Sequence, residues 1–120
     1  MKAGHDLDVL IAEKVMGYHR PTNNPTSLFL YDEHGEYAWD PEDGPHYSVN
    51  IADAWLVVEK MREDRWRFVI AGVPEGIAAS FRRGNSFQGE EPYQESAALA
   101  ICVAALKAKG TAVAETQKND

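Results

Sequence analysis

Hydrophobic residues recur with helical spacing in three stretches of the chain. The first runs from about His5 to Met16 and stops before Gly17, a residue type that ends helices. The second follows Asn50, whose side chain can cap a helix together with Asp53 three residues later. Its apolar positions fall on one predicted face: Ile51, Ala54, Trp55, Val58 and Met61.

The third helical stretch begins after Ser96, which can act as its cap, and runs to about Lys109 with Gly110 as its stop. Apolar residues surround this predicted helix on nearly every side. We therefore expect it to be buried on more than one side.

Between the helices, two stretches alternate apolar and polar residues and predict hairpins. "SLFLYD" (27–32) precedes a turn at Glu33 to Gly35 and a weaker second strand that ends at Trp39. "RWRFVIAG" (65–72) and "GIAASFRR" (76–83) flank a tight turn at Pro74 to Gly76. Two antiparallel hairpins follow from this pattern.

The resulting order α-ββ-α-ββ-α predicts an α+β fold in which helices sandwich a small antiparallel sheet of about four strands. A chain of 120 residues has the size of one domain. We assign residues 1–110 to a single α/β/α sandwich domain and residues 111–120 to a polar, frayed tail.

Charge is distributed unevenly along the chain, whose net charge is −7. The segment 32–46 holds six acidic residues and no Lys or Arg. This balance disfavours direct binding to nucleic acid, where Lys and Arg must neutralise phosphates. The longest apolar run, 97–106, is half the length of a membrane-spanning helix, so no membrane association is expected. A single cysteine, Cys102, agrees with a reducing cytoplasm.

Three helical blocks carry a resemblance to a known family. "LDVLIAEKVMGY" (7–18), "YSVNIADAWLVVEKM" (47–61) and "ALAICVAALKA" (98–108) resemble the signature blocks of the phage ABA sandwich domain, in the same order. The resemblance implies a helix–sheet–helix sandwich in a phage or prophage protein. It therefore implies the cytoplasm of an infected or lysogenic bacterium as its location. It brings no catalytic motif.

Motifs for catalysis, metals or cofactors are missing from the pattern. The four histidines are scattered without zinc-ligand spacing, and "DPEDG" (40–44) lacks the spacing of a calcium loop. Ser48, His46 and Asp53 contain the groups of a catalytic relay, but no nucleophile elbow accompanies them. Cys102 fits a small core residue. We expect no catalytic residues, no metal and no cofactor, and an enzyme is the least supported function.

The three tryptophans have different expected environments. Trp55 on the stripe of the second helix and Trp66 near the start of a strand are expected in the core. Trp39 follows the acidic hairpin, where it either packs into the structure or forms an exposed stacking surface with Tyr37 and Tyr47.

Residues 80–96 have the composition of a loop that binds a nucleotide-like anion. Arg82 and Arg83 can grip phosphate with their guanidinium forks, and Phe87 and Tyr93 offer rings on which a base can stack. The alternative is a solvated loop in which nearby glutamates neutralise the arginines. The first reading predicts a non-enzymatic phage accessory protein that sequesters a nucleotide-like small molecule of host defence signalling and forms a homo-oligomer.

A second function stays open, in which the acidic segment is the interaction surface. It would dock on a basic host protein or mimic nucleic acid. The residues predicted to form this surface are Tyr37, Trp39, Asp40, Glu42, Asp43 and Tyr47.

Overall fold

The computed structural model describes residues 2–84 and 93–110, and within them three helices and four strands follow the predicted order. The predicted tail at 111–120 lies outside the described residues. The elements are α1 (His5–Lys14), β1 (Leu30–Tyr31), β2 (Tyr37–Trp39), α2 (Ile51–Glu63), β3 (Arg67–Val73), β4 (Gly76–Arg82) and α3 (Ala97–Ala108).

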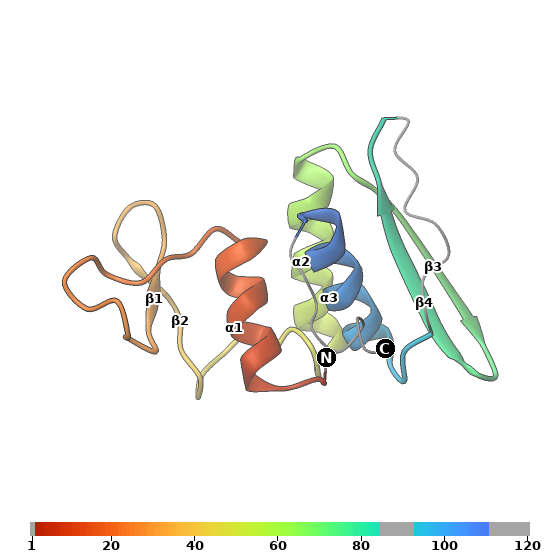
Figure 1. The fold of residues 1–120 in the computed structure, drawn as a ribbon, viewed down its shortest axis with the longest axis horizontal. Coiled ribbons are helices and arrows are strands. Elements are labelled where there is room, and N and C mark those ends of the chain that lie inside the picture. The colour runs from red at the N-terminus through yellow and green to blue at the C-terminus, as the bar shows by residue number, and fades with distance from the viewer. Residues whose placement is uncertain (1, 85–92, 111–120) are drawn as a thin grey trace.

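The four described strands agree with the predicted number of about four, but they form two separate two-stranded antiparallel sheets and not one sheet. Figure 1 shows the reason: α1 stands between β1–β2 and the pair α2 and α3, while β3–β4 lies on the other side of that pair. Helices therefore occupy the middle of the molecule and the hairpins lie on its flanks. The α+β class is confirmed.

The hairpin β3–β4 is antiparallel and regular, from Arg67 opposite Arg82 to Val73 opposite Gly76. One of its faces packs on α2 and α3 through Phe81 and Ala79, which are buried. The other edge of β4 is occupied at its start, because Ile77 exchanges two main-chain hydrogen bonds with Gln94, of 2.8 and 2.7 Å. This leaves β3 as the outer strand of the described sheet.

The core lies where α1, α2 and α3 meet, and nine of the residues of α3 are buried, as its all-round apolar pattern predicts. On α2 the buried face differs from the predicted one. It consists of Ala54, Val57, Val58 and Met61, whereas Ile51 and Trp55 are exposed. Trp55 meets the hairpin only through an edge-to-face contact with Phe68, with ring centres 5.8 Å apart, and this contact leaves 45% of the residue exposed.

Helix caps agree in part with the sequence. Oδ1 of Asn50 accepts from the N–H groups of Ala52 and Asp53 at 2.9 and 3.2 Å, as predicted for a cap. The carboxylate of Asp53 does not return this bond and accepts instead from the N–H of His46 at 2.9 Å. Ser96 caps α3 by accepting from the N–H of Leu99. No described helix is long and apolar enough to cross a membrane.

Candidate functional site

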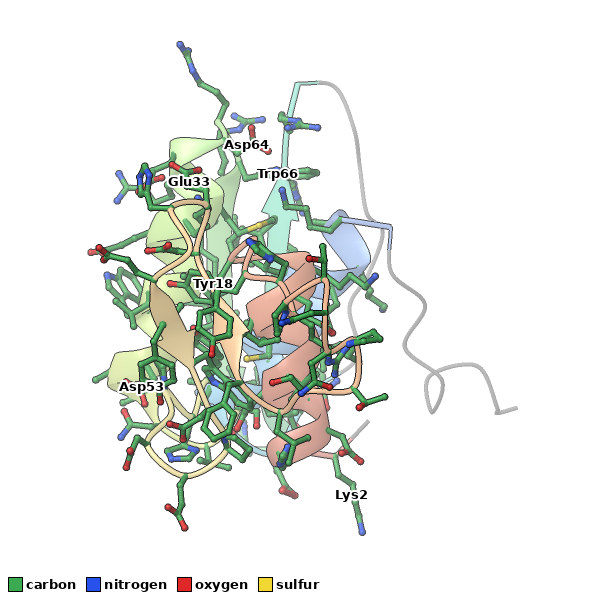
Figure 2. All side chains as sticks on the ribbon, turned by 90° about the vertical axis from the view of Figure 1, so that its left-hand side faces the viewer. Lys2, Tyr18, Glu33, Asp53, Asp64 and Trp66 are labelled. Atoms are coloured by element: carbon green, nitrogen blue, oxygen red, sulfur yellow. The ribbon has the colours of Figure 1, made fainter. Side chains whose placement is uncertain are left out.

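Basic side chains gather at one end of the molecule, where α2 and α3 end, β3 begins and β4 ends. Eight of the twelve Lys and Arg residues of the chain belong to this region, against three acidic residues among those that the structure describes, Glu59, Glu63 and Asp64. Figure 2 shows Asp64 and Trp66 at this end, surrounded by nitrogen-tipped side chains. We call it the basic end, and it consists of Lys60, Arg62, Arg65, Arg67, Arg82, Arg83, Lys107 and Lys109.

Asp64, the residue after α2, ties three of these elements together. Its Oδ2 atom lies 3.1 Å from Nη1 of Arg83 and 3.4 Å from Nζ of Lys109. The hydrogen bond from Lys109, helped by the charge of Arg83, holds the pKa of the Asp64 carboxyl below its ordinary value. A single carboxylate therefore orients two cations that come from β4 and α3.

Arg83 is also held by an aromatic ring. Its guanidinium carbon lies 4.4 Å from the centre of the ring of Trp66, the buried residue that precedes β3. A cation over an indole face is attracted by the negative charge of the ring face. Stacked on one side and half exposed, Arg83 presents its planar group at the surface in a fixed orientation.

Arg67 and Arg82 are direct partners across β3 and β4. Side chains of directly paired residues lie on the same face of a sheet, and like charges in this arrangement repel each other. An anion between two such arginines would remove the repulsion and accept hydrogen bonds from both. The pair places two positive charges side by side on the face of the hairpin that points away from α2 and α3.

A pocket opens beside Asp64 and Lys109, where α2 and α3 end. It has a volume of about 330 Å³ and is lined by Lys60, Glu63, Asp64 and Lys109. This volume is at the lower limit of small-molecule sites in proteins. Such a pocket fits a phosphate-sized or mononucleotide-sized group.

The structure brings together only part of the site predicted in 80–96. Arg82 and Arg83 lie in the basic end, and Phe87 lies outside the described residues. Tyr93 lies at the other end of β4, because its neighbour Gln94 pairs with Ile77. Arg82 lies five positions further along the strand than Ile77, which corresponds to about 17 Å. Tyr93 instead borders a separate pocket of about 590 Å³ together with Lys2 and Glu95.

Comparison with known proteins identifies the family to which the chain belongs. The phage ABA sandwich domain matches residues 9–106. The chain belongs to this family. A solved structure, the 2.0 Å crystal structure of a phage protein from Bacillus cereus ATCC 14579, is 27% identical to it with a TM-score of 0.61. The match covers 88% of this chain and 90% of that one. No curated protein matches the chain in a sequence search.

The acidic segment of this ABA sandwich protein is more structural than its sequence suggests. Trp39 is 1% exposed, and its indole N–H donates to the carbonyl of Pro45 at 2.8 Å, so an exposed stacking surface at Trp39 is ruled out. Tyr47 is fully buried and burial raises the pKa of its hydroxyl. Asp40 is buried too, and its Oδ1 accepts from the N–H groups of Glu42 and Asp43. Tyr37, Glu42 and Asp43 remain exposed.

The three residues of the relay considered in the sequence do not form one. Ser48 is buried and its hydroxyl is bonded to Gly4, accepting from the N–H at 2.7 Å and donating to the carbonyl at 3.3 Å. Its own N–H donates to buried Asp8 at 2.8 Å, and His46 approaches Asp8 at 3.9 Å. This cluster fixes the start of α1 to the segment before α2. Within residues 2–84 and 93–110, no group of three His, Cys, Asp or Glu side chains is arranged to hold a metal.

Sequence reasoning missed Trp66, Asp64 and Lys109 as parts of a site. The four elements that form the basic end are separated from one another in the sequence, so their charges are dispersed along the chain. One signal was present, because pairing the two strands about the turn at Pro74 places Arg67 opposite Arg82. Basic residues are common in the last turn of a helix because they interact favourably with the helix dipole. Those at the ends of α2 and α3 therefore do not stand out in the sequence as parts of a site.

Proposed function

We propose that this phage ABA sandwich protein is a non-enzymatic accessory protein that binds and sequesters a nucleotide-like small molecule of host defence signalling through its basic end. The observation that carries the proposal is the gathering of three arginines at the open end of one hairpin: the stacked, half-exposed Arg83 on the side of α2 and α3, and the facing pair Arg67 and Arg82 on the opposite face. These three guanidinium groups stand on the ends of one hairpin, in a chain whose net charge is −7.

Each part of a nucleotide has a counterpart in this arrangement. Phosphate oxygens would accept from the guanidinium forks of Arg67 and Arg82, which match phosphate geometry. A base would stack on the exposed face of Arg83, since planar guanidinium groups stack on nucleobases. Lys109 and Lys60 line the adjacent pocket and would neutralise a second phosphate.

Calorimetric titration with a panel of cyclic nucleotides and nucleoside polyphosphates tests the proposal. We expect binding to at least one member, weakened about tenfold or more by Arg82→Ala and by Arg67→Ala, since a charge-assisted contact contributes about 1.5–3 kcal/mol. Lys2→Ala is the matched control, because it removes one exposed positive charge at the end of the molecule opposite to Asp64 (Figure 2). Absence of binding across the panel, or equal weakening by all three variants, would refute the proposal.

A second candidate function is docking on a host protein through the β1–β2 hairpin. Leu28, Phe29 and Tyr37 are exposed there, and the rings of Phe29 and Tyr37 contact each other with centres 6.3 Å apart. Exposed Glu33, Glu36, Glu42 and Asp43 belong to the same region of the chain. An apolar centre with an acidic rim suits a basic protein partner. Tyr37→Ser together with Phe29→Ser should then abolish capture of that partner while leaving nucleotide binding intact.

A further inference from the structure

We propose that β3 pairs with β3 of a second copy of the chain, in antiparallel orientation about Ile70, to form a four-stranded sheet across a homodimer. The inference starts from the outer edge of β3. No described strand pairs with this edge, whereas the corresponding edge of β4 is already bonded to Gln94.

The direction of the main-chain groups follows from one contact. Because both main-chain groups of Ile77 bind Gln94, they point away from β3, and Ile77 and Gly72 form a pair without mutual hydrogen bonds. Such pairs alternate with bonded pairs along an antiparallel ladder. Phe68, Ile70 and Gly72 therefore direct their N–H and C=O groups toward the outer edge, where they can bond to a second strand.

With the twofold axis at Ile70, all seven residues of β3 pair with the second copy. The side chains that then face each other are complementary. Ile70 faces Ile70 of the second copy, and Phe68 faces Gly72, so that a large side chain meets a position without one. The antiparallel arrangement also keeps the two basic ends at opposite ends of the new sheet, where they do not repel each other.

An unexplained apolar surface lies beside this edge. Ile51 and Trp55 of α2 are 54% and 45% exposed, and Ile70 is 42% exposed. Trp55 contacts Phe68 edge to face with ring centres 5.8 Å apart, so helix and strand form one continuous patch. Pairing of β3 would bring the two copies of this patch together and remove it from water.

The size of the surface is sufficient for a dimer. A strand edge of seven residues is about 23 Å long, and the sheet together with the helix layer is about 20 Å deep. Each copy would thus bury on the order of 500 Å², which meets the total of about 1,000 Å² required of a specific interface.

Sedimentation equilibrium with two point variants tests the oligomer. Wild-type protein should show a mass of about twice 13.4 kDa. Ile70→Lys places two like charges at the axis and should weaken association by about 100-fold or more. Val69→Lys is the control, because Val69 is equally exposed on the opposite face of β3 and should leave the dimer intact. A monomeric wild type, or a dimer unaffected by Ile70→Lys, would overturn the inference.

Amide hydrogen exchange tests the register without any substitution, and so remains decisive if Ile70→Lys does not fold. The amides of Phe68, Ile70 and Gly72 should become protected as protein concentration rises through the dissociation constant. Those of Val69 and Ala71, bonded to β4 in both states, should not respond to concentration. If these three amides stay unprotected while the measured mass is that of a dimer, the interface lies elsewhere and the inference is wrong.

Discussion

The guanidinium of Arg83 lies 4.4 Å above the ring of Trp66, and this stacked pair connects the core of the protein to its most basic surface. Trp66 is buried, whereas the side chain of Arg83 is half exposed. The ring thereby fixes the position of a charge that a flexible arginine would otherwise hold loosely, and a preorganised donor loses less entropy when it binds.

Replacing Asp64 should strengthen anion binding. Asp64→Asn removes a carboxylate that is bonded to both Arg83 and Lys109, so an incoming phosphate no longer faces its negative charge. A unit charge a few ångströms away in a watery surface contributes about 1 kcal/mol, so we expect affinity for a nucleotide to rise about fivefold. Glu63→Gln lies in the same pocket without these bonds and serves as the comparison in a calorimetric titration. Weaker binding by Asp64→Asn would show that Asp64 holds the arginine for the ligand rather than competing with it.

The same residue gives a pH dependence of stability. Because the folded pKa of Asp64 is depressed, its stabilising contribution is present above the unfolded value of 3.8 and is lost as the pH falls through the folded value. Asp64→Asn should therefore unfold at lower urea concentration than wild type near neutral pH. The two proteins should become equal in stability well below pH 4. A difference that persists in strong acid would assign the effect to something other than the carboxylate charge.

Asp8 is expected to behave in the opposite way. Burial raises the pKa of its carboxyl even though the hydrogen bonds from Ser48 oppose the shift. A raised acid pKa means that stability falls as the pH rises from 3.8 through the folded value, because the folded state must then hold a buried charge. Asp8→Asn, which keeps an acceptor for the Ser48 N–H, should thus gain in stability relative to wild type as the pH increases.

Asp8→Ala isolates the hydrogen bond when it is compared with Asp8→Asn, because both variants lack the charge. It leaves the buried N–H of Ser48 without an acceptor, and we expect a loss of about 1–3 kcal/mol in the free energy of unfolding relative to Asp8→Asn. Asp6→Ala on the same helix is the control, since Asp6 is exposed and should change stability by less than about 0.5 kcal/mol relative to wild type. Urea denaturation of the three variants and wild type at pH 7 measures both differences. Equal stability of Asp8→Ala and Asp8→Asn would mean that the contact with Ser48 does not anchor α1.

Two tryptophans should differ sharply in their contribution to stability. Trp39 is 1% exposed and bonded to Pro45, so Trp39→Ala should cost about 3–5 kcal/mol. Trp55 is 45% exposed, so Trp55→Ala should cost about 1 kcal/mol or less when measured on the monomer, at protein concentrations below the dimer dissociation constant. Thermal unfolding of both variants, followed by circular dichroism, provides the measurement. A greater loss for Trp55 would reverse the assignment of core and surface.

This reversal between Trp39 and Trp55 also shows where the sequence was informative. The helices and hairpins were predictable because their signals are local: Asn50 and Ser96 cap α2 and α3, and Gly110 follows α3 with a positive φ of 81°. Which residue of an apolar stripe is covered depends on the neighbouring element. Trp55 is left partly exposed by its neighbours. Trp39 is buried because the acidic turn folds back on it and bonds to its indole N–H through Pro45.

The candidate site was predictable only at Arg82 and Arg83. Composition of one loop suggested that Tyr93 would join them, but the pairing of Gln94 with Ile77 carries Tyr93 to the far end of β4. Arg67, Trp66, Asp64 and Lys109 reach the site from other elements. Their meeting depends on strand register and on the packing of helix ends, which no single stretch of sequence encodes.

Backbone amide spectra recorded during titration with ATP and with a cyclic dinucleotide test the central claim most directly. If the basic end binds the phosphates, shifts should concentrate at Arg67, Arg82, Arg83 and Lys109 and at the indole N–H of Trp66, and should diminish with added salt. Shifts confined to the β1–β2 hairpin or to the pocket beside Tyr93, or none with either ligand, would contradict the account.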